Sequence, residues 1–171
     1  MKTRILFISI LSLVFSVYMF GQNTALDKFF NDYLEDPSFT VVNISPKMFQ
    51  MISKLDIDDI DPEVNELINS LDRLKILVKE NGDGLTLFNE AHGKINKNEF
   101  EELMTIRDKD ENVRIYVKDA GDIINELILL VGSHEEFVLL DITGKIDLKT
   151  IGKLGNTLDA PGIKHLNKLG N

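Results

Sequence analysis

The sequence predicts an α+β fold in which helices pack on an antiparallel sheet. Three stretches of the C-terminal half, residues 113–117, 123–131 and 137–142, carry this prediction, because β-branched and aliphatic residues dominate them. Short polar turns at 119–122 and 132–135 separate these stretches. Strands joined by short turns usually pair as neighbours, so we expect a C-terminal three-stranded meander.

The N-terminal elements follow from start and stop signals. Residues 25–35 place their apolar side chains on one helical stripe, and Pro37 ends that helix. The β-branched stretch 39–44 predicts a strand. Ser45-Pro46 supplies an N-cap and a first-turn proline for a helix that reaches Leu55.

The middle of the chain continues this alternation. Asp61-Pro62 starts a second short amphipathic helix, and residues 74–78 predict a strand. Residues 81–84 form a glycine-rich turn. Residues 85–95 fit no clear period, and we expect irregular or strand structure there. Asn96 is expected to cap a helix that runs through Ile106.

The end of the chain predicts two more helices. After Thr143-Gly144, Asp147 can cap a helix through Leu154. A last short helix covers 162–169.

The strands at 123–131 and 137–142 are apolar on both sides, whereas a sheet with one wet face alternates more cleanly. Either the chain covers both faces itself, or one face meets a partner. We expect internal cover, by the helices at 25–35 and 97–106, because surplus apolar surface is usually buried within the chain.

The N-terminus predicts export. Lys2 and Arg4 precede the apolar run 5–20, and Gly21 follows it, which is the pattern of a signal peptide. The run is shorter than the roughly 20 apolar residues of a membrane span. We therefore expect a signal peptide at 1–21 and a single α+β domain at 22–171, periplasmic or secreted.

Composition excludes several classes of function. The chain has no cysteine, which rules out a lipoprotein anchor, thiol catalysis and Cys-based metal sites. Removing Lys2 and Arg4 with the leader takes the net charge from −9 to −11, so nucleic acid and anionic membranes are disfavoured as partners. The absence of tryptophan argues against a carbohydrate-stacking site.

Three polar segments resemble ligand loops only superficially. Residues 56–61 alternate acids as calcium loops do, but Asp61 stands where the loop requires glycine and Leu67 where it requires glutamate. Residues 108–112 lack the same tight turn, and we interpret them as a polar connection. Residues 81–84 lack the phosphate-binding fingerprints, so we interpret them as a turn.

No catalytic constellation is recognisable. His92, His134 and His165 lie far apart and form no metal-binding pair, and His134 falls in a predicted turn. Ser45 and Ser53 are explained as a cap and a helix surface. The 28 acidic residues offer too many carboxylate pairs for the sequence to single one out. We therefore assign no catalytic, cofactor-binding or metal-binding residue, and no cofactor.

The helix after Ser45-Pro46 carries two methionines. Met48 and Met51 form an apolar stripe with Phe49 and Ile52. Methionine-rich faces can bind partner peptides, but on so short a helix we expect these residues in the core.

Several segments resemble a known family. Residues 138–154, reading VLLDITGKIDLKTIGKL, are similar to the end of the exported family called domain of unknown function 4252 (DUF4252). Residues 39–49 and 123–131 resemble it too, so the likeness spans residues 25–155. It implies a small envelope protein of unknown activity without assigned catalytic residues, in a family suspected of a link to envelope sigma-factor signalling. Some members look like lipoproteins, from which this cysteine-free chain departs.

These observations lead to three hypotheses. The first is a non-enzymatic exported protein that binds another protein, or itself, through an apolar sheet face. The second is a module that binds a small ligand or a cation, which predicts a pocket between sheet and helices. The third is a hydrolase, which predicts titratable groups that converge in a cleft with one displaced pKa.

Overall fold

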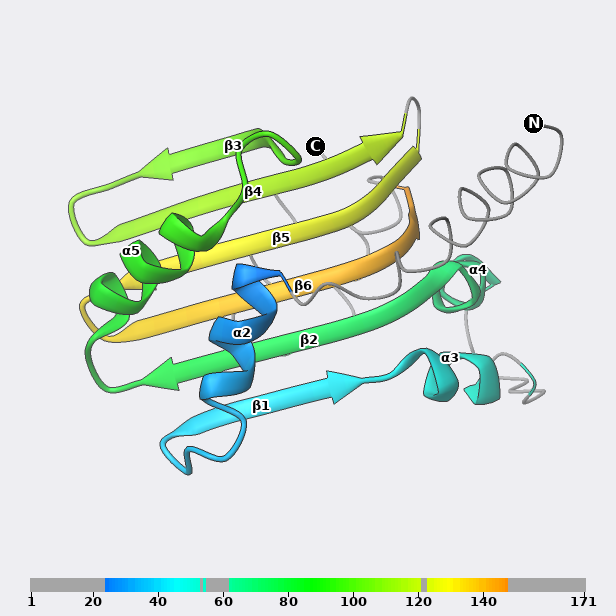
Figure 1. The fold of residues 1–171 in the computed structure, drawn as a ribbon, viewed down its shortest axis with the longest axis horizontal. Coiled ribbons are helices and arrows are strands. Elements are labelled where there is room, and N and C mark those ends of the chain that lie inside the picture. Colours follow the sequence, from blue (N-terminus) through cyan, green and yellow to red (C-terminus); the bar gives the residue numbers. More distant parts are fainter. Residues whose placement is uncertain (1–23, 53, 55–61, 121–122, 148–171) are drawn as a thin grey trace, which may run out of the picture.

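The structure is a computed structural model, and it describes residues 24–52, 54, 62–120 and 123–147. Within these residues, six strands form one antiparallel sheet in the order β1-β2-β6-β5-β4-β3 (Figure 1). The sheet is made of β1 (Phe39–Ile44), β2 (Leu71–Glu80), β3 (Glu101–Arg107), β4 (Glu111–Ala120), β5 (Ile123–Ser133) and β6 (Glu136–Ile146). The helices are α2 (Ala25–Asp32), α3 (Pro46–Ile52), α4 (Pro62–Ser70) and α5 (Gly84–Lys94).

The predicted α+β class and the C-terminal meander are confirmed. Strands β4, β5 and β6 follow one another along the chain and pair as antiparallel neighbours. The strand predicted at 74–78 becomes the longer β2, which pairs with the free side of β6. The two most apolar strands, β5 and β6, therefore lie in the middle of the sheet.

Side-chain caps start both α2 and α3, and the cap at Ser45 confirms the start predicted from the sequence. The Thr24 hydroxyl accepts a hydrogen bond from the Asp27 backbone N–H at 3.0 Å, and the Asp27 carboxylate accepts one from the Thr24 backbone N–H at 3.0 Å. This reciprocal capping box fixes the first turn of α2. The Ser45 hydroxyl likewise accepts from the Met48 backbone N–H at 3.4 Å at the start of α3.

Two predictions in the middle of the chain are wrong. Residues 84–94 form the helix α5, not irregular or strand structure, because Leu87, Phe88 and Ala91 share one helical face that packs on the sheet. The helix predicted from Asn96 through Ile106 is limited to one turn, in which the Glu99 and Phe100 backbone N–H groups donate to the Asn96 carbonyl.

The rest of that segment is the edge strand β3. Its Met104 and Ile106 alternate and pack against the core of the sheet, whereas Leu103, which precedes Met104, is exposed. Pairing with β4 thus outweighs the helical spacing of the apolar residues.

Helices α2 and α5 cover one face of the sheet (Figure 1). Phe29 and Phe30 of α2 and Phe88 of α5 are buried against side chains from β2, β4, β5 and β6. The sheet residues of this layer are Leu77, Tyr116, Ile128, Leu130, Phe137 and Leu139.

The opposite face is buried as well. Its central residues Ile115, Leu129 and Leu140 are at most 1% exposed, and Phe49 of α3 and Ile68 of α4 pack into the same cluster. Both sides of β5 and β6 are therefore buried within the single chain, which confirms the expected internal cover. The helices that provide it differ from those expected: α2 from 25–35 and α5, which takes the place of 97–106, cover the same face, and α3 and α4 contact the opposite one.

Several predictions lie outside the described residues. They are the signal peptide at 1–21, the acidic segment 56–61 with its Asp61 cap, Ser53, the turn residues 121–122, the helices at 147–154 and 162–169, and His165. Among the residues that are described, no helix combines the length and apolar character needed to cross a membrane.

Candidate functional site

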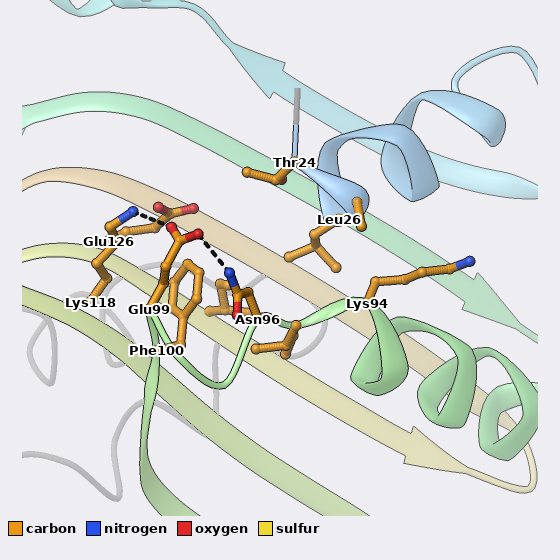
Figure 2. A pocket seen from close by; sticks show the side chains of 11 residues that line it. Thr24, Leu26, Lys94, Asn96, Glu99, Phe100, Lys118 and Glu126 are labelled. Carbon is orange, nitrogen blue, oxygen red and sulfur yellow. Dashed lines mark hydrogen bonds and ion pairs between the residues drawn. The ribbon is translucent and has the colours of Figure 1, made fainter. Parts of the chain in front are cut away.

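A cavity of about 540 Å³ opens between α2, the α5–β3 connection and the strands β4 and β5 (Figure 2). Its walls combine five apolar side chains with six that are polar or charged. The apolar contributors are Ala25, Leu26, Ile95, Phe100 and Ile128; the remaining lining residues are Thr24, Lys94, Asn96, Glu99, Lys118 and Glu126. The cavity is thus amphipathic, as small-molecule sites are.

An ion pair crosses one side of this cavity. The Lys118 ammonium donates to the Glu99 carboxylate at 2.6 Å, and the Asn96 amide donates to the same carboxylate at 2.7 Å (Figure 2). These hydrogen bonds lower the pKa of Glu99, while the bond to Glu99 raises the pKa of Lys118. Glu99 therefore stays ionised, and both charges are already satisfied.

Glu126 of β5 is the unusual group. Its side chain is 17% exposed, and Arg73 Nη2 at 4.0 Å is its one cationic contact among the described residues. Burial, reinforced by the negative charge of Asp141 and only partly offset by Arg73, raises the pKa of Glu126 to about 7. A carboxyl that lines the cavity therefore exchanges its proton near neutral pH.

Glu126 belongs to a buried charge cluster, which we define as Asp27, Arg73, Lys75, Glu126 and Asp141. Arg73 Nη2 donates to Asp141 at 3.1 Å, Arg73 Nη1 lies 3.6 Å from Asp27, and Lys75 Nζ donates to Asp27 at 2.6 Å. Three carboxyls thus share two cations. Burial raises the pKa of Asp141 as well, against the opposing effect of Arg73. One proton in the cluster would balance its charge.

The strand registers explain why these residues meet. Arg73 and Glu126 both lie opposite Thr143, and Lys75 lies opposite Asp141 in the next row of the same face. Register shifts occur immediately before Arg73 and Glu126, on the two strands that flank β6. Such irregularities redirect side chains next to functional sites.

A second polar group lies outside the cavity. The Tyr116 hydroxyl is 2.7 Å from His92 Nδ1 and donates to Glu102 at 3.3 Å, while Arg114 donates to Glu102 at 2.7 Å. Burial and the charge of Arg114 lower the pKa of His92. This group ties α5 to β3 and β4, and we interpret it as structural.

The segments considered from the sequence have structural roles where they are described. Residues 81–84 form the turn before α5, and the Gly82 N–H donates to the Glu135 carbonyl at 3.1 Å. Residues 108–112 connect β3 to β4, and His134 is exposed in the β5–β6 turn. Across the described part of the chain, no group of three or more histidines or acids is arranged to hold a metal ion.

The α3 stripe differs from expectation. Phe49 is buried, but Met48 and Met51 are 50% and 55% exposed rather than in the core.

The sequence analysis missed the buried charge cluster. Its signal was present, since Glu126 and Asp141 are single acids inside the apolar runs IINELILLV and FVLLDI. Acids are rarely buried without a partner, so each marks a position worth examining. Their meeting with Arg73 and Lys75 depends on registers across three strands, which the sequence does not display.

Comparison with known proteins places the chain in a family. The family described as Domain of unknown function (DUF4252) matches residues 32–154, a range that contains all six described strands, Glu126 and Asp141. The chain matches no curated protein and no solved structure. The family match covers well over half of the sequence, in agreement with the resemblance seen in its segments, and the chain therefore belongs to the DUF4252 family.

Proposed function

We propose that this protein is an exported binding protein whose cavity takes a small amphipathic ligand. One observation carries the proposal: a partly apolar cavity is lined by a largely buried carboxyl, Glu126, whose ion pair with Arg73 is long, at 4.0 Å. Burying an ionisable group without a dedicated partner costs stability, and such groups concentrate at functional sites. The basic and apolar leader at 1–21 supports export.

A binding role explains the cavity better than hydrolysis. Glu99 and Glu126 line the same cavity with pKa values displaced in opposite directions, which is the pattern of acid and base pairs. Glu99, however, is held by Lys118 and Asn96, so its carboxylate is not available as a base or nucleophile. One available carboxyl suits recognition better than a two-carboxyl mechanism.

A blocking substitution tests this proposal. Ala25 lines the cavity from the exposed first turn of α2, so Ala25→Trp fills the space without disturbing the core. Ligand-observed NMR with a set of small soluble fragments is expected to detect binding to the wild-type protein and to Asn31→Trp, an exposed site on the same helix. Binding should be lost in Ala25→Trp. No binding to the wild type, or binding equal in both variants, would contradict the proposal.

A protein partner remains a second proposal, supported by a different surface. Both faces of the central strands are buried, so an apolar sheet face no longer supports it. The support is now Val42 of the edge strand β1, 36% exposed, with Met48 and Met51 of α3. Sedimentation analysis should show self-association that Met48→Lys/Met51→Lys abolishes; a monomeric wild type would argue against self-association.

A further inference from the structure

We infer that the polar end of the ligand is a protonated amine, which donates hydrogen bonds to Glu126 while an apolar body lies against Leu26, Phe100 and Ile128. This inference deepens the proposed function and rests on it. It assigns the ligand to the alkylammonium class. The argument depends on which charges of the site are already paired.

The two cations of the buried charge cluster, Arg73 and Lys75, are already paired with carboxylates. Arg73 donates to Asp141 at 3.1 Å, and Lys75 donates to Asp27 at 2.6 Å. After these two pairings, Glu126 has the longest ion-pair contact in the buried charge cluster, 4.0 Å from Arg73 Nη2. A single positive charge next to Glu126 would therefore neutralise the cluster, and the cavity is the side from which it can arrive.

The two cations that line the cavity, Lys118 and Lys94, also form ion pairs within the protein. Lys118 is paired with Glu99 at 2.6 Å, and Lys94 lies 3.8 Å from Glu90. A carboxylate ligand would have to break one of these pairs and would face Glu126 as a like charge. An ammonium group would meet a carboxyl that needs a donor, so the site discriminates between head groups by charge.

The apolar wall of the cavity determines the chemical character of the ligand beyond its head group. Leu26, Phe100 and Ile128 are each buried, and they come from α2, the α5–β3 connection and β5. Figure 2 shows Leu26 and Phe100 on opposite sides of the space, with Glu126 beyond the Lys118–Glu99 pair. A short alkyl chain can lie along these side chains and gain burial energy without further polar contacts.

Ligand binding is coupled to one proton. Without a ligand, the proton on Glu126 balances the charge of the cluster. The charged groups around Glu126 are Asp27 from α2, Arg73 and Lys75 from β2, Asp141 from β6 and Lys118 from β4. The ammonium replaces that proton: the Glu126 carboxylic acid and the ammonium ion give a carboxylate–ammonium pair, and one proton passes to solvent. The affinity for an ammonium ligand should therefore increase with pH.

Three probes that differ only in their head group test the inference: hexylammonium chloride, 1-hexanol and sodium hexanoate. Isothermal titration calorimetry on the exported protein at pH 8 should show hexylammonium binding at least about tenfold more tightly than the other two. Because Glu126 titrates near 7, hexylammonium should bind about tenfold more weakly at pH 6 than at pH 8.

Variants distinguish the contribution of Glu126 to hexylammonium binding from that of the overall surface charge. Glu126→Gln should lose at least about tenfold in hexylammonium affinity and lose the pH dependence, whereas Glu126→Asp should keep part of both. Glu135→Gln, which changes an exposed acid in the β5–β6 turn away from the cavity lining, should bind like wild type. Circular dichroism confirms that each variant is folded.

The outcomes distinguish this inference from the proposed function. If 1-hexanol binds as tightly as hexylammonium, the cavity is a ligand site but the amine assignment is wrong. Preference for hexanoate, or an unchanged Glu126→Gln, also overturns it. If none of the three probes binds and no fragment binds, both proposals fail.

Discussion

Glu126 and Asp141 behave as one acid with two carboxyl groups. Both side chains are largely buried, and Arg73 contacts both, at 3.1 Å from Asp141 and 4.0 Å from Glu126. One oxygen of Asp141, Oδ1, makes no hydrogen bond, although the side chain is almost fully buried. A proton on Glu126 would give this oxygen a donor, because the two carboxyls are close enough to influence each other.

Glu126→Gln is expected to make stability less sensitive to pH. The folded protein holds the Glu126 proton up to about pH 7, whereas the unfolded chain releases it near the ordinary value of 4.5, so wild-type stability falls as pH rises from 5 to 8. Relative to wild type, the variant should gain about 2 kcal/mol between these two pH values. Urea unfolding of both proteins measures this difference.

The comparison between the two proteins removes the titrations of groups that do not interact with Glu126. The lowered pKa of His92 makes stability rise with pH, but this effect is common to both proteins and cancels. A difference in unfolding free energy that stays constant from pH 5 to 8 would show that Glu126 titrates normally.

At the scale of elements, a buried ion pair attaches α2 to the sheet. Lys75 of β2 is buried, and its Nζ atom contacts Asp27 at 2.6 Å and lies 4.9 Å from the Phe30 ring centre. The same Asp27 completes the capping box at the start of the helix. The Asp27 carboxylate therefore both caps α2 and binds the helix to β2, and so fixes the part of the cavity wall that α2 forms.

Removing one partner of this pair should cost more than removing both. Asp27→Asn leaves the Lys75 charge buried and is expected to lower the unfolding free energy by about 3 kcal/mol. Asp27→Asn/Lys75→Met should lose less than the sum of the two single variants. Urea unfolding at pH 7 provides the values, with the exposed Asp32→Asn as the control on the same helix. Additive losses would mean that the two residues do not interact.

Helix α5 sits on the β5–β6 hairpin through close backbone contacts. A Cβ atom on Gly84 would overlap the Glu136 and Ser133 carbonyl oxygens, and one on Gly132 would overlap the Phe88 side chain. The segment 85–95 was not predicted as helix, because its apolar residues fit no clear period in the sequence. The absent side chains of Gly84 and Gly132 allow the approach that buries Phe88.

Two alanine substitutions on α5 should have opposite effects. Gly84→Ala forces backbone atoms apart and is expected to cost about 2 kcal/mol or more. Gly93→Ala meets no atom within 4 Å and should stabilise the helix by about 0.5–1 kcal/mol. Thermal unfolding of both variants checks the sign. Equal effects would show that Gly84 is not in close contact.

At the scale of the whole molecule, the sequence predicted the fold better than the site. The strand at 113–117 was recognisable from its alternation of apolar and polar residues, and those at 123–131 and 137–142 from apolar residues on both sides. The edge strand β3 was not, since one exposed side and an open edge leave little pattern to read. The cavity depends on how α2, α5 and the sheet pack, so no local pattern encodes it.

The proposed export makes a prediction about the whole chain. Protein recovered from the culture medium or the envelope fraction should begin at or within a few residues of Gln22, because the leader is removed after Gly21. N-terminal sequencing or intact mass measurement checks this. A folded cytoplasmic protein that retains Met1 would contradict export.

The most direct test of the Glu126 site is a carbon-13 NMR titration of its side-chain carboxyl. In the free protein the midpoint should lie near pH 7. With saturating hexylammonium it should move well below that value, since the bound ammonium stabilises the carboxylate. A midpoint at the ordinary pKa of a glutamate, or one that hexylammonium does not change, would contradict the account.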